Sequence, residues 1–79
     1  MSAAIDRVVA ELAAAHALVP SEARVVAALS HTTARGDIAD ELGLSENTVK
    51  GEVRTMLEKT GFKNTRALQL EIWRRVSEL

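Results

Sequence analysis

The sequence predicts an all-α fold, and three observations support that prediction. The chain of 79 residues is rich in alanine, leucine, valine, glutamate and arginine, and it holds one proline and four glycines. Apolar residues recur at three- and four-residue spacing, which is the pattern of amphipathic helices. Residues 39–57 read as a helix, a tight turn and a second helix, the layout of a helix-turn-helix.

The first helix is expected over residues 3–17. Its apolar stripe consists of Ile5, Val8, Val9, Leu12 and His16. The helix must end before Pro20, because proline disfavours helical geometry at the residue that precedes it. A weak boundary therefore divides the chain into an amphipathic helix, residues 1–18, and a domain, residues 19–79. The N-terminal helix would serve as a linker or as a packing or dimerisation helix.

The second helix is expected to run from Pro20 to about His31, since proline suits the first helical position. Val19 then occupies the cap position without a side-chain hydroxyl. The third helix is expected over roughly Ala34 to Leu42. The residues expected to face inward in these two helices are Val25, Val26, Leu29, Ile38, Ala39 and Leu42.

A turn at Gly43 is expected to join the third helix to the fourth. Glycine can adopt the left-handed conformation that ends a helix, and Ser45 can cap the next one with its hydroxyl. The fourth helix is expected from Glu46 to about Thr60, and Gly61 would end it. Its inward residues are Val49, Val53, Met56 and Leu57.

A fifth helix is expected to begin at a cap formed by Asn64 or Thr65 and to reach the C-terminus. Its core face would consist of Leu68, Ile72, Val76 and Leu79. Leu70 and Trp73 would then lie on its flank, away from the centre of that face.

Composition argues against several classes of function. Without cysteine the chain has no disulfide, no thiolate metal site and no thiol nucleophile. His16 and His31 lie fifteen residues apart, so we expect no metal site. We find no catalytic constellation and no glycine-rich phosphate loop, and we therefore expect no enzyme activity and no cofactor. No apolar run approaches the ~20 residues of a membrane span, and the first residues lack the features of a signal peptide. These features predict a cytoplasmic protein.

The charges of the chain are balanced, with a net charge of −1. Residues 33–66 contain six basic and six acidic side chains. Because neutralisation of phosphates supplies most non-specific affinity for nucleic acid, this balance predicts weak non-specific binding. Specific binding depends on which face of the domain carries which charge.

Helical geometry separates the fourth helix into two faces. Opposite its apolar residues lie Asn47, Lys50, Gly51, Arg54 and Glu58. This face could contact nucleic acid, or it could be a solvated face in which Glu46 and Lys50 form an ion pair. Ser45, Asn47 and Thr48 lie at the helix N-terminus, where exposed amides favour phosphate, although capping alone would also explain Ser45. Glu52 lies at the edge of the buried face and should pair with a basic neighbour.

From Leu18 to about Ile72 the chain resembles the DNA-binding domain of LuxR-type transcriptional regulators. The matching residues, which fall in register without a gap, are Leu18, Pro20, Glu22, Val25, Val26, Leu29, Ile38, Ala39, Leu42, Gly43, Leu44, Ser45, Thr48, Val49, Lys50, Leu57, Lys59, Gly61 and Leu68. The chain departs from the usual family residues at Val19, Thr32, Ala34, Gly51 and Glu52.

The resemblance implies a tetrahelical helix-turn-helix, which here carries an additional N-terminal helix. It also implies that the helix expected from Glu46 to about Thr60, the fourth of this chain, reads the major groove of double-stranded DNA. Lys50 and Arg54 would then contact base edges or phosphates. The full set of expected DNA-binding residues is Ser45, Asn47, Thr48, Lys50, Gly51, Arg54, Arg35 and Lys59. The family also places its last helix at a dimer interface, which implies a weak homodimer through Leu70 and Trp73. Alternatively, the first helix covers these two residues.

Two other functions fit the same sequence pattern. Region 4 of a sigma factor shares the turn motif and binds promoter DNA, and its partner would be RNA polymerase. A helix-turn-helix that has become a protein-interaction or dimerisation module would explain the balanced charge and Gly51. Co-purification with polymerase would favour the first alternative, and the absence of a basic stripe around Lys50 and Arg54 would favour the second.

Overall fold

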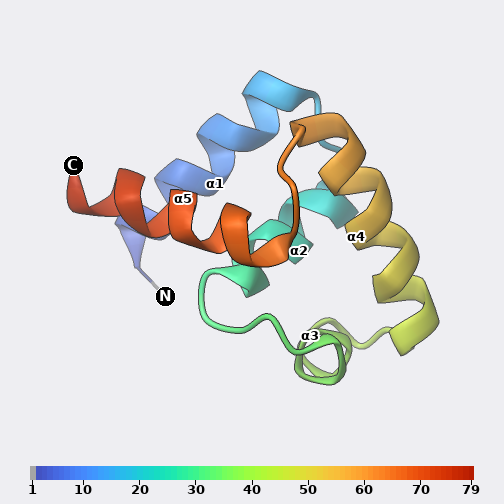
Figure 1. Cartoon of the computed structure of the whole chain (residues 1–79). Coiled ribbons are helices and arrows are strands. Elements are labelled where there is room, and N and C mark those ends of the chain that lie inside the picture. The colour runs from blue at the N-terminus through green and yellow to red at the C-terminus, as the bar shows by residue number, and fades with distance from the viewer. Residues whose placement is uncertain (1) are drawn as a thin grey trace.

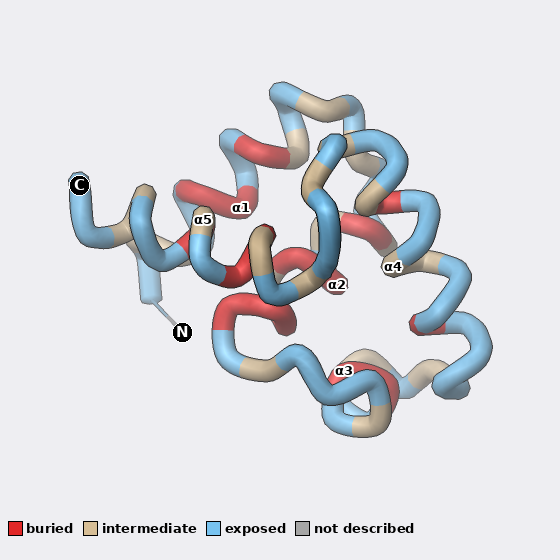
Figure 2. Tube along the Cα trace, viewed as in Figure 1, coloured by how far each residue is buried: buried red, intermediate tan, exposed pale blue. Residues whose placement is uncertain are grey.

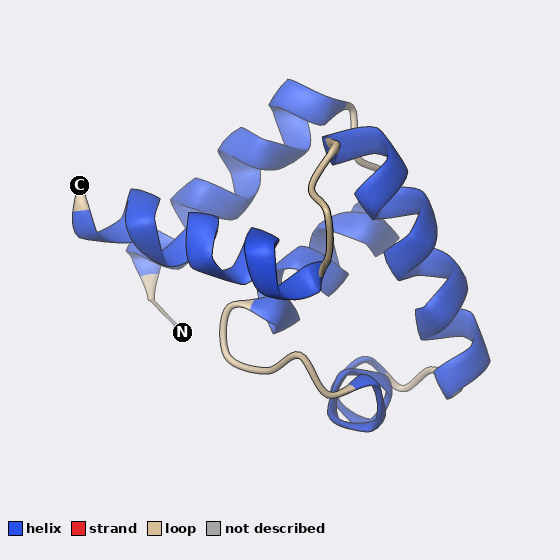
Figure 3. Ribbon diagram, in the orientation of Figure 1, coloured by secondary structure: helices blue, strands red, loops and turns tan. Residues whose placement is uncertain are grey.

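The computed structural model describes residues 2–79 and is all-helical, as the composition predicts. The described chain forms five helices and no strand (Figures 1 and 3): α1 (Ala3–His16), α2 (Pro20–Leu29), α3 (Arg35–Leu42), α4 (Glu46–Thr60) and α5 (Thr65–Ser77). The observed bounds of α4 agree with the prediction, and the other four helices agree to within a few residues. None of the helices over residues 2–79 has the length and apolar character of a membrane span.

The core forms around α2, which packs against each of the other four helices. Buried segments face the interior from every helix (Figure 2). The apolar core consists of Val8, Val9, Leu12, Val25, Val26, Ala28, Leu29, Ile38, Ala39, Val49, Met56, Leu68 and Ile72. Because α3 and α4 contribute only four of these residues, the core leaves most of the surface of α4 outside.

Side-chain caps and left-handed residues fix the helix ends where the sequence predicts them. The Ser45 hydroxyl accepts the backbone N–H of Thr48 at 3.1 Å. Asn64, rather than Thr65, caps α5 by accepting the N–H of Ala67 at 2.8 Å. Gly43 has φ = 68° and Gly61 has φ = 77°, so both stand where a side chain would be strained.

The end of α2 and the start of α3 differ from the prediction, and side-chain hydrogen bonds explain both differences. The second helix ends at Leu29 and not near His31, because the Ser30 hydroxyl donates back to the Ala27 carbonyl within the last turn. The third begins at Arg35, one residue later than expected. The Thr32 hydroxyl accepts the N–H of Ala34 at 3.1 Å, and this local bond holds the connection outside the helix.

The prediction that Leu79 belongs to the core face of α5 is wrong. The helix ends at Ser77, so the stripe that contains Leu68 and Ile72 does not continue to Leu79, which is exposed. The remaining member of that stripe, Val76, is half-buried. The predicted core face of α5 is therefore correct within the helix and wrong only at Leu79, which lies beyond its last residue.

Candidate nucleic-acid interface

The turn between α3 and α4 is closed by backbone hydrogen bonds. Past the left-handed Gly43, the Leu44 N–H donates to the Ala39 carbonyl at 2.9 Å and satisfies the end of α3. Leu42 and Leu44 are half-buried and pack against the core on either side of the glycine. This packing holds α4 at a fixed angle to α3.

One face of α4 is buried and the opposite face is open to solvent. Val49 and Met56 are fully buried. The residues exposed on the outer side include five that the sequence predicts as DNA-binding and one that it missed: Asn47, Thr48, Lys50, Gly51, Arg54 and Thr55. Thr55 follows Gly51 by one helical turn, so the same spacing rule could have identified it. At the N-terminus of α4, Ser45 is also exposed, and its hydroxyl donates to Thr48 Oγ1 at 2.9 Å.

Three basic side chains of α3 and α4 form no ion pair within the described residues, although Glu46 and Glu58 of α4 are also exposed. Within residues 2–79, Lys50, Arg54 and Arg35 form no ion pair, and all three are exposed. In particular, Glu46 and Lys50 do not form the ion pair that a merely solvated face would have. Lys50 and Arg54 of α4 are therefore available to an anionic partner.

Gly51 lies in the middle of this open face. A Cβ atom built at this position would meet nothing within 4 Å, so the packing of the protein does not require glycine here. Glycine in a helix costs about 1 kcal/mol relative to alanine. Because Gly51 has no side chain, the helix backbone is uncovered at this one position of the outer face, and a ligand could approach it closely.

Lys59, which the resemblance implies as a DNA-binding residue, has a partner within the protein. Its ammonium donates to Glu22 Oε1 at 2.8 Å, and Glu22 is only 2% exposed. The same carboxylate accepts the N–H of Val19 at 2.9 Å. The hydrogen bond from Lys59 outweighs burial and lowers the pKa of Glu22, so the buried group stays ionised. A pattern of helical faces gives no sign of this pair, whose members are 37 residues apart.

Glu52 also differs from expectation, because its partner is a hydroxyl and not a basic side chain. Ser21 Oγ donates to Glu52 Oε2 at 3.1 Å. The half-buried Glu52 is thereby directed toward α2 and away from the outer face of α4. Its negative charge does not lie among the exposed cations.

A small apolar surface lies on α5. Leu70 is 55% exposed and Trp73 is 47% exposed, so α1 does not cover them, although α1 packs against α5. The first helix instead buries Val8 and Leu12 in the core. The Trp73 indole N–H donates to the Ser30 carbonyl at 2.8 Å, which fixes the ring at the end of α2.

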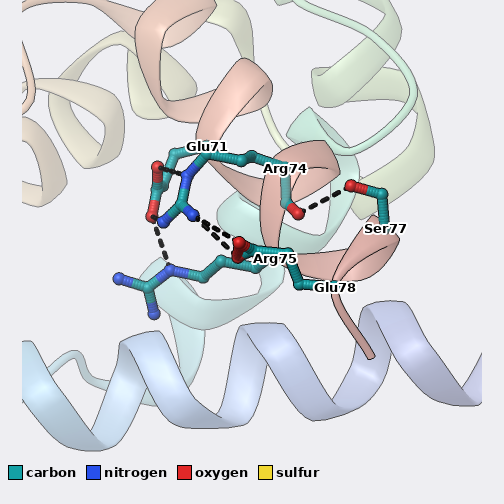
Figure 4. Close-up of polar contacts among 5 residues, drawn as sticks. All are labelled: Glu71, Arg74, Arg75, Ser77 and Glu78. Carbon is teal, nitrogen blue, oxygen red and sulfur yellow. Dashed lines mark hydrogen bonds and ion pairs between the residues drawn. The ribbon is translucent and has the colours of Figure 1, made fainter.

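Arg74 and Arg75 of α5 differ from Lys50 and Arg54 of α4, because carboxylates pair with both of them. The Glu71 carboxylate contacts both Arg74 and Arg75 (Figure 4). The N–O distances are 2.7 Å to Arg74 and 2.6 Å to Arg75, and Arg74 also contacts Glu78 at 2.7 Å. The hydrogen bonds from Arg74 and Arg75 lower the pKa of Glu71 to about 2. This end of α5 therefore presents little free positive charge.

Over residues 2–79 the structure has no pocket and no group of three or more side chains that could hold a metal ion. His31 contacts Glu41 and so links the end of α2 to α3.

In comparisons with known proteins, no family model, no curated protein and no solved structure matches the chain.

Proposed function

We propose that this protein is the DNA-binding domain of a transcriptional regulator, in which α3 and α4 act as a helix-turn-helix and α4 enters the major groove. The observation that carries the proposal is the outer face of α4, where Lys50 and Arg54 are exposed and unpaired among polar side chains. Long basic side chains on such a face can donate to guanine edges or to phosphates. The regulator would act in the cytoplasm on double-stranded DNA, without catalysis.

Three further features support this reading. The N-terminus of α4 carries exposed Ser45, Asn47 and Thr48, where backbone amides and the helix dipole favour a phosphate. Arg35, at the start of α3, adds another exposed cation that forms no ion pair within residues 2–79. The open backbone at Gly51 permits close approach to DNA.

The proposal includes a homodimer formed through α5. Leu70 and Trp73 leave an apolar surface uncovered, and tryptophan is a frequent anchor of protein interfaces. A two-fold dimer would place two copies of α4 on paired half-sites of one DNA duplex. Because the uncovered surface is small, we expect weak association that depends on concentration or on DNA.

The test begins with selection of a DNA sequence from a random library by the purified chain. Lys50→Ala and Arg54→Ala should each weaken binding to the selected sequence by ~1–3 kcal/mol if the side chain contacts a base, and should relax specificity at one position of each half-site. Arg7→Ala is the matched control, since it removes the same charge from α1, where Arg7 pairs with Glu11.

The measurement is fluorescence anisotropy on selected and scrambled duplexes at several salt concentrations. With few free cations on α4, the affinity should depend on salt less steeply than that of a strongly basic repressor. Unchanged affinity of the Lys50→Ala/Arg54→Ala double variant would remove α4 from the mechanism. Failure to enrich any sequence would refute specific DNA binding.

A further inference from the structure

Two polar links join α2 to α4, and both start from the first turn of α2. Ser21 Oγ donates to Glu52 Oε2 at 3.1 Å, and Glu22 Oε1 accepts from Lys59 Nζ at 2.8 Å. Ser21 and Glu22 are neighbours in the chain, whereas Glu52 and Lys59 are seven residues apart on α4. With 3.6 residues per turn, a spacing of seven returns to nearly the same side of a helix. Both contact points therefore lie on one stripe of α4.

This stripe lies beside the buried face of α4. Two contacts on one stripe, about 10 Å apart at 1.5 Å per residue, oppose both rotation of the helix about its axis and tilting against α2. The apolar contacts of Val49 and Met56 hold α4 on the core but have no directional requirement. Hydrogen bonds do have one, because they weaken steeply when the donor and acceptor are misaligned.

The two links differ in strength. Glu22 is buried and ionised, with the Val19 N–H and the Lys59 ammonium as partners, so loss of Lys59 would leave a buried charge unpaired. This link is a fixed anchor near the end of α4. The link from Ser21 to Glu52 is only half-buried, and it holds the middle of α4, between Lys50 and Arg54.

We propose that Ser21, Glu22, Glu52 and Lys59 form a positioning clamp that sets the rotation of α4 about its own axis. The clamp residues touch no DNA. They determine the direction in which Lys50 and Arg54 leave the domain, and this consequence rests on the proposed function. Of the two links in the clamp, the hydrogen bond between Ser21 and Glu52 is the one that can be removed without leaving a buried charge unpaired.

The variants that test the clamp leave Glu22 and Lys59 intact, because their loss could unfold the protein. Ser21→Ala removes the donor, while Ser21→Thr keeps a hydroxyl. Glu52→Gln keeps an acceptor oxygen and removes the charge. Ile5→Val is the matched control, since it weakens the packing of half-buried Ile5 in α1 without contact to the clamp.

The first measurement needs no DNA. Residual dipolar couplings of backbone N–H groups in the full chain report the orientation of α4 relative to α2. In the wild type, Ser21→Thr, Glu52→Gln and Ile5→Val, the couplings of both helices should fit one common arrangement. In Ser21→Ala, those of α4 should no longer fit it. An unchanged orientation of α4 in Ser21→Ala would overturn the clamp.

The second measurement is affinity for the selected duplex, at a temperature where every variant is fully folded. Ser21→Ala should lower specific affinity about threefold to tenfold, the size of effect expected for one half-buried hydrogen bond of ordinary strength. Ser21→Thr should restore it, and Ile5→Val should bind like the wild type. Glu52→Gln should bind at least as tightly as the wild type, since it keeps the bond and loses a negative charge.

The two measurements separate the clamp from the proposed function. If the wild type selects no DNA, the proposed function fails, and the dipolar couplings still decide whether the clamp orients α4. If α4 reorients in Ser21→Ala but its affinity for selected DNA equals that of Ile5→Val, the clamp does not govern how α4 meets DNA, and that part of the proposal is refuted.

Discussion

Val19 is the residue at which the chain starts a helix without a capping hydroxyl. Its backbone is extended, with φ = −78° and ψ = 163°, and its side chain makes no cap hydrogen bond. The reciprocal half of a capping box is present, because Glu22 accepts the Val19 N–H. Since Val19 is 47% exposed, replacing it sacrifices little buried apolar surface.

We therefore expect Val19→Thr to complete the capping box and to raise the free energy of unfolding by ~0.5–2 kcal/mol. Urea denaturation followed by circular dichroism measures this change. Val19→Ala is the control, because it also removes the valine side chain but adds no acceptor. If threonine and alanine give the same midpoint, the added hydroxyl does not cap α2.

Some helix ends can be predicted from the residues next to them, and others cannot. The caps at Ser45 and Asn64 and the turn at Gly43 follow from short-range chemistry, and the structure confirms them. The left-handed Ala17 at the end of α1, with φ = 53°, could not be predicted, because alanine does not mark that conformation. There the Leu18 N–H donates to the Ala13 carbonyl at 2.9 Å and closes the end of the helix.

At the scale of a single element, the last turns of α5 carry a group of ion pairs that should respond to acid. Arg74 and Arg75 hold the pKa of Glu71 at about 2, below its ordinary value of 4.5. A carboxyl group whose pKa is lower in the folded protein stabilises the fold above its ordinary pKa. That stabilisation is lost as the pH falls from about 4.5 to about 2. Arg74 is 57% exposed, so solvent screens part of the effect.

Glu71→Gln should therefore lower the melting temperature at pH 7, and the difference from the wild type should shrink as the pH falls through this window. Thermal denaturation of both proteins at pH 7 and at pH 3 tests the expectation. Glu78→Gln serves as the control, since Glu78 contacts only Arg74 and is itself exposed. A difference between Glu71→Gln and the wild type that is constant across this range would show that the ion pairs do not stabilise α5.

The amino-acid sequence predicts the helices of this chain better than it predicts the polar contacts between them. The apolar spacing predicts where each helix lies, since a helix buries one face whatever its neighbours are. It gives no information on the partner of a polar side chain on another helix. The hydrogen bonds that join α2 and its C-cap to α4 and α5 connect residues 31, 37, 40 and 43 positions apart, through Ser21, Glu22, Gln69 and Trp73. The resemblance implies a DNA contact for Lys59, and only the structure shows that its ammonium donates to Glu22.

At the scale of the whole molecule, the exposed surface of α5 leads to a prediction about self-association. Leu70→Glu introduces a charge into the proposed dimer contact but affects no hydrogen bond of the monomer. Sedimentation equilibrium at high protein concentration should show a weak dimer for the wild type and a monomer for this variant. Both should have the same helical content.

Trp73→Phe provides the matched comparison, because it keeps an aromatic ring at the surface but removes the hydrogen bond to the Ser30 carbonyl. Loss of this hydrogen bond at the end of α2 should lower the free energy of unfolding, whereas the remaining aromatic ring should preserve most of the dimer affinity. A wild type that remains monomeric at high concentration, both free and on a palindromic duplex, would contradict the dimer.

The packing of α1 on α5 brings the start of the first helix and the end of the last one to the same side of the molecule (Figure 1). The outer face of α4 lies at the other side (Figure 1). A tag, fluorophore or surface tether attached at either end would therefore leave α4 unobstructed. The chain can be immobilised through one end and labelled through the other, so that binding assays and single-molecule measurements can share one preparation.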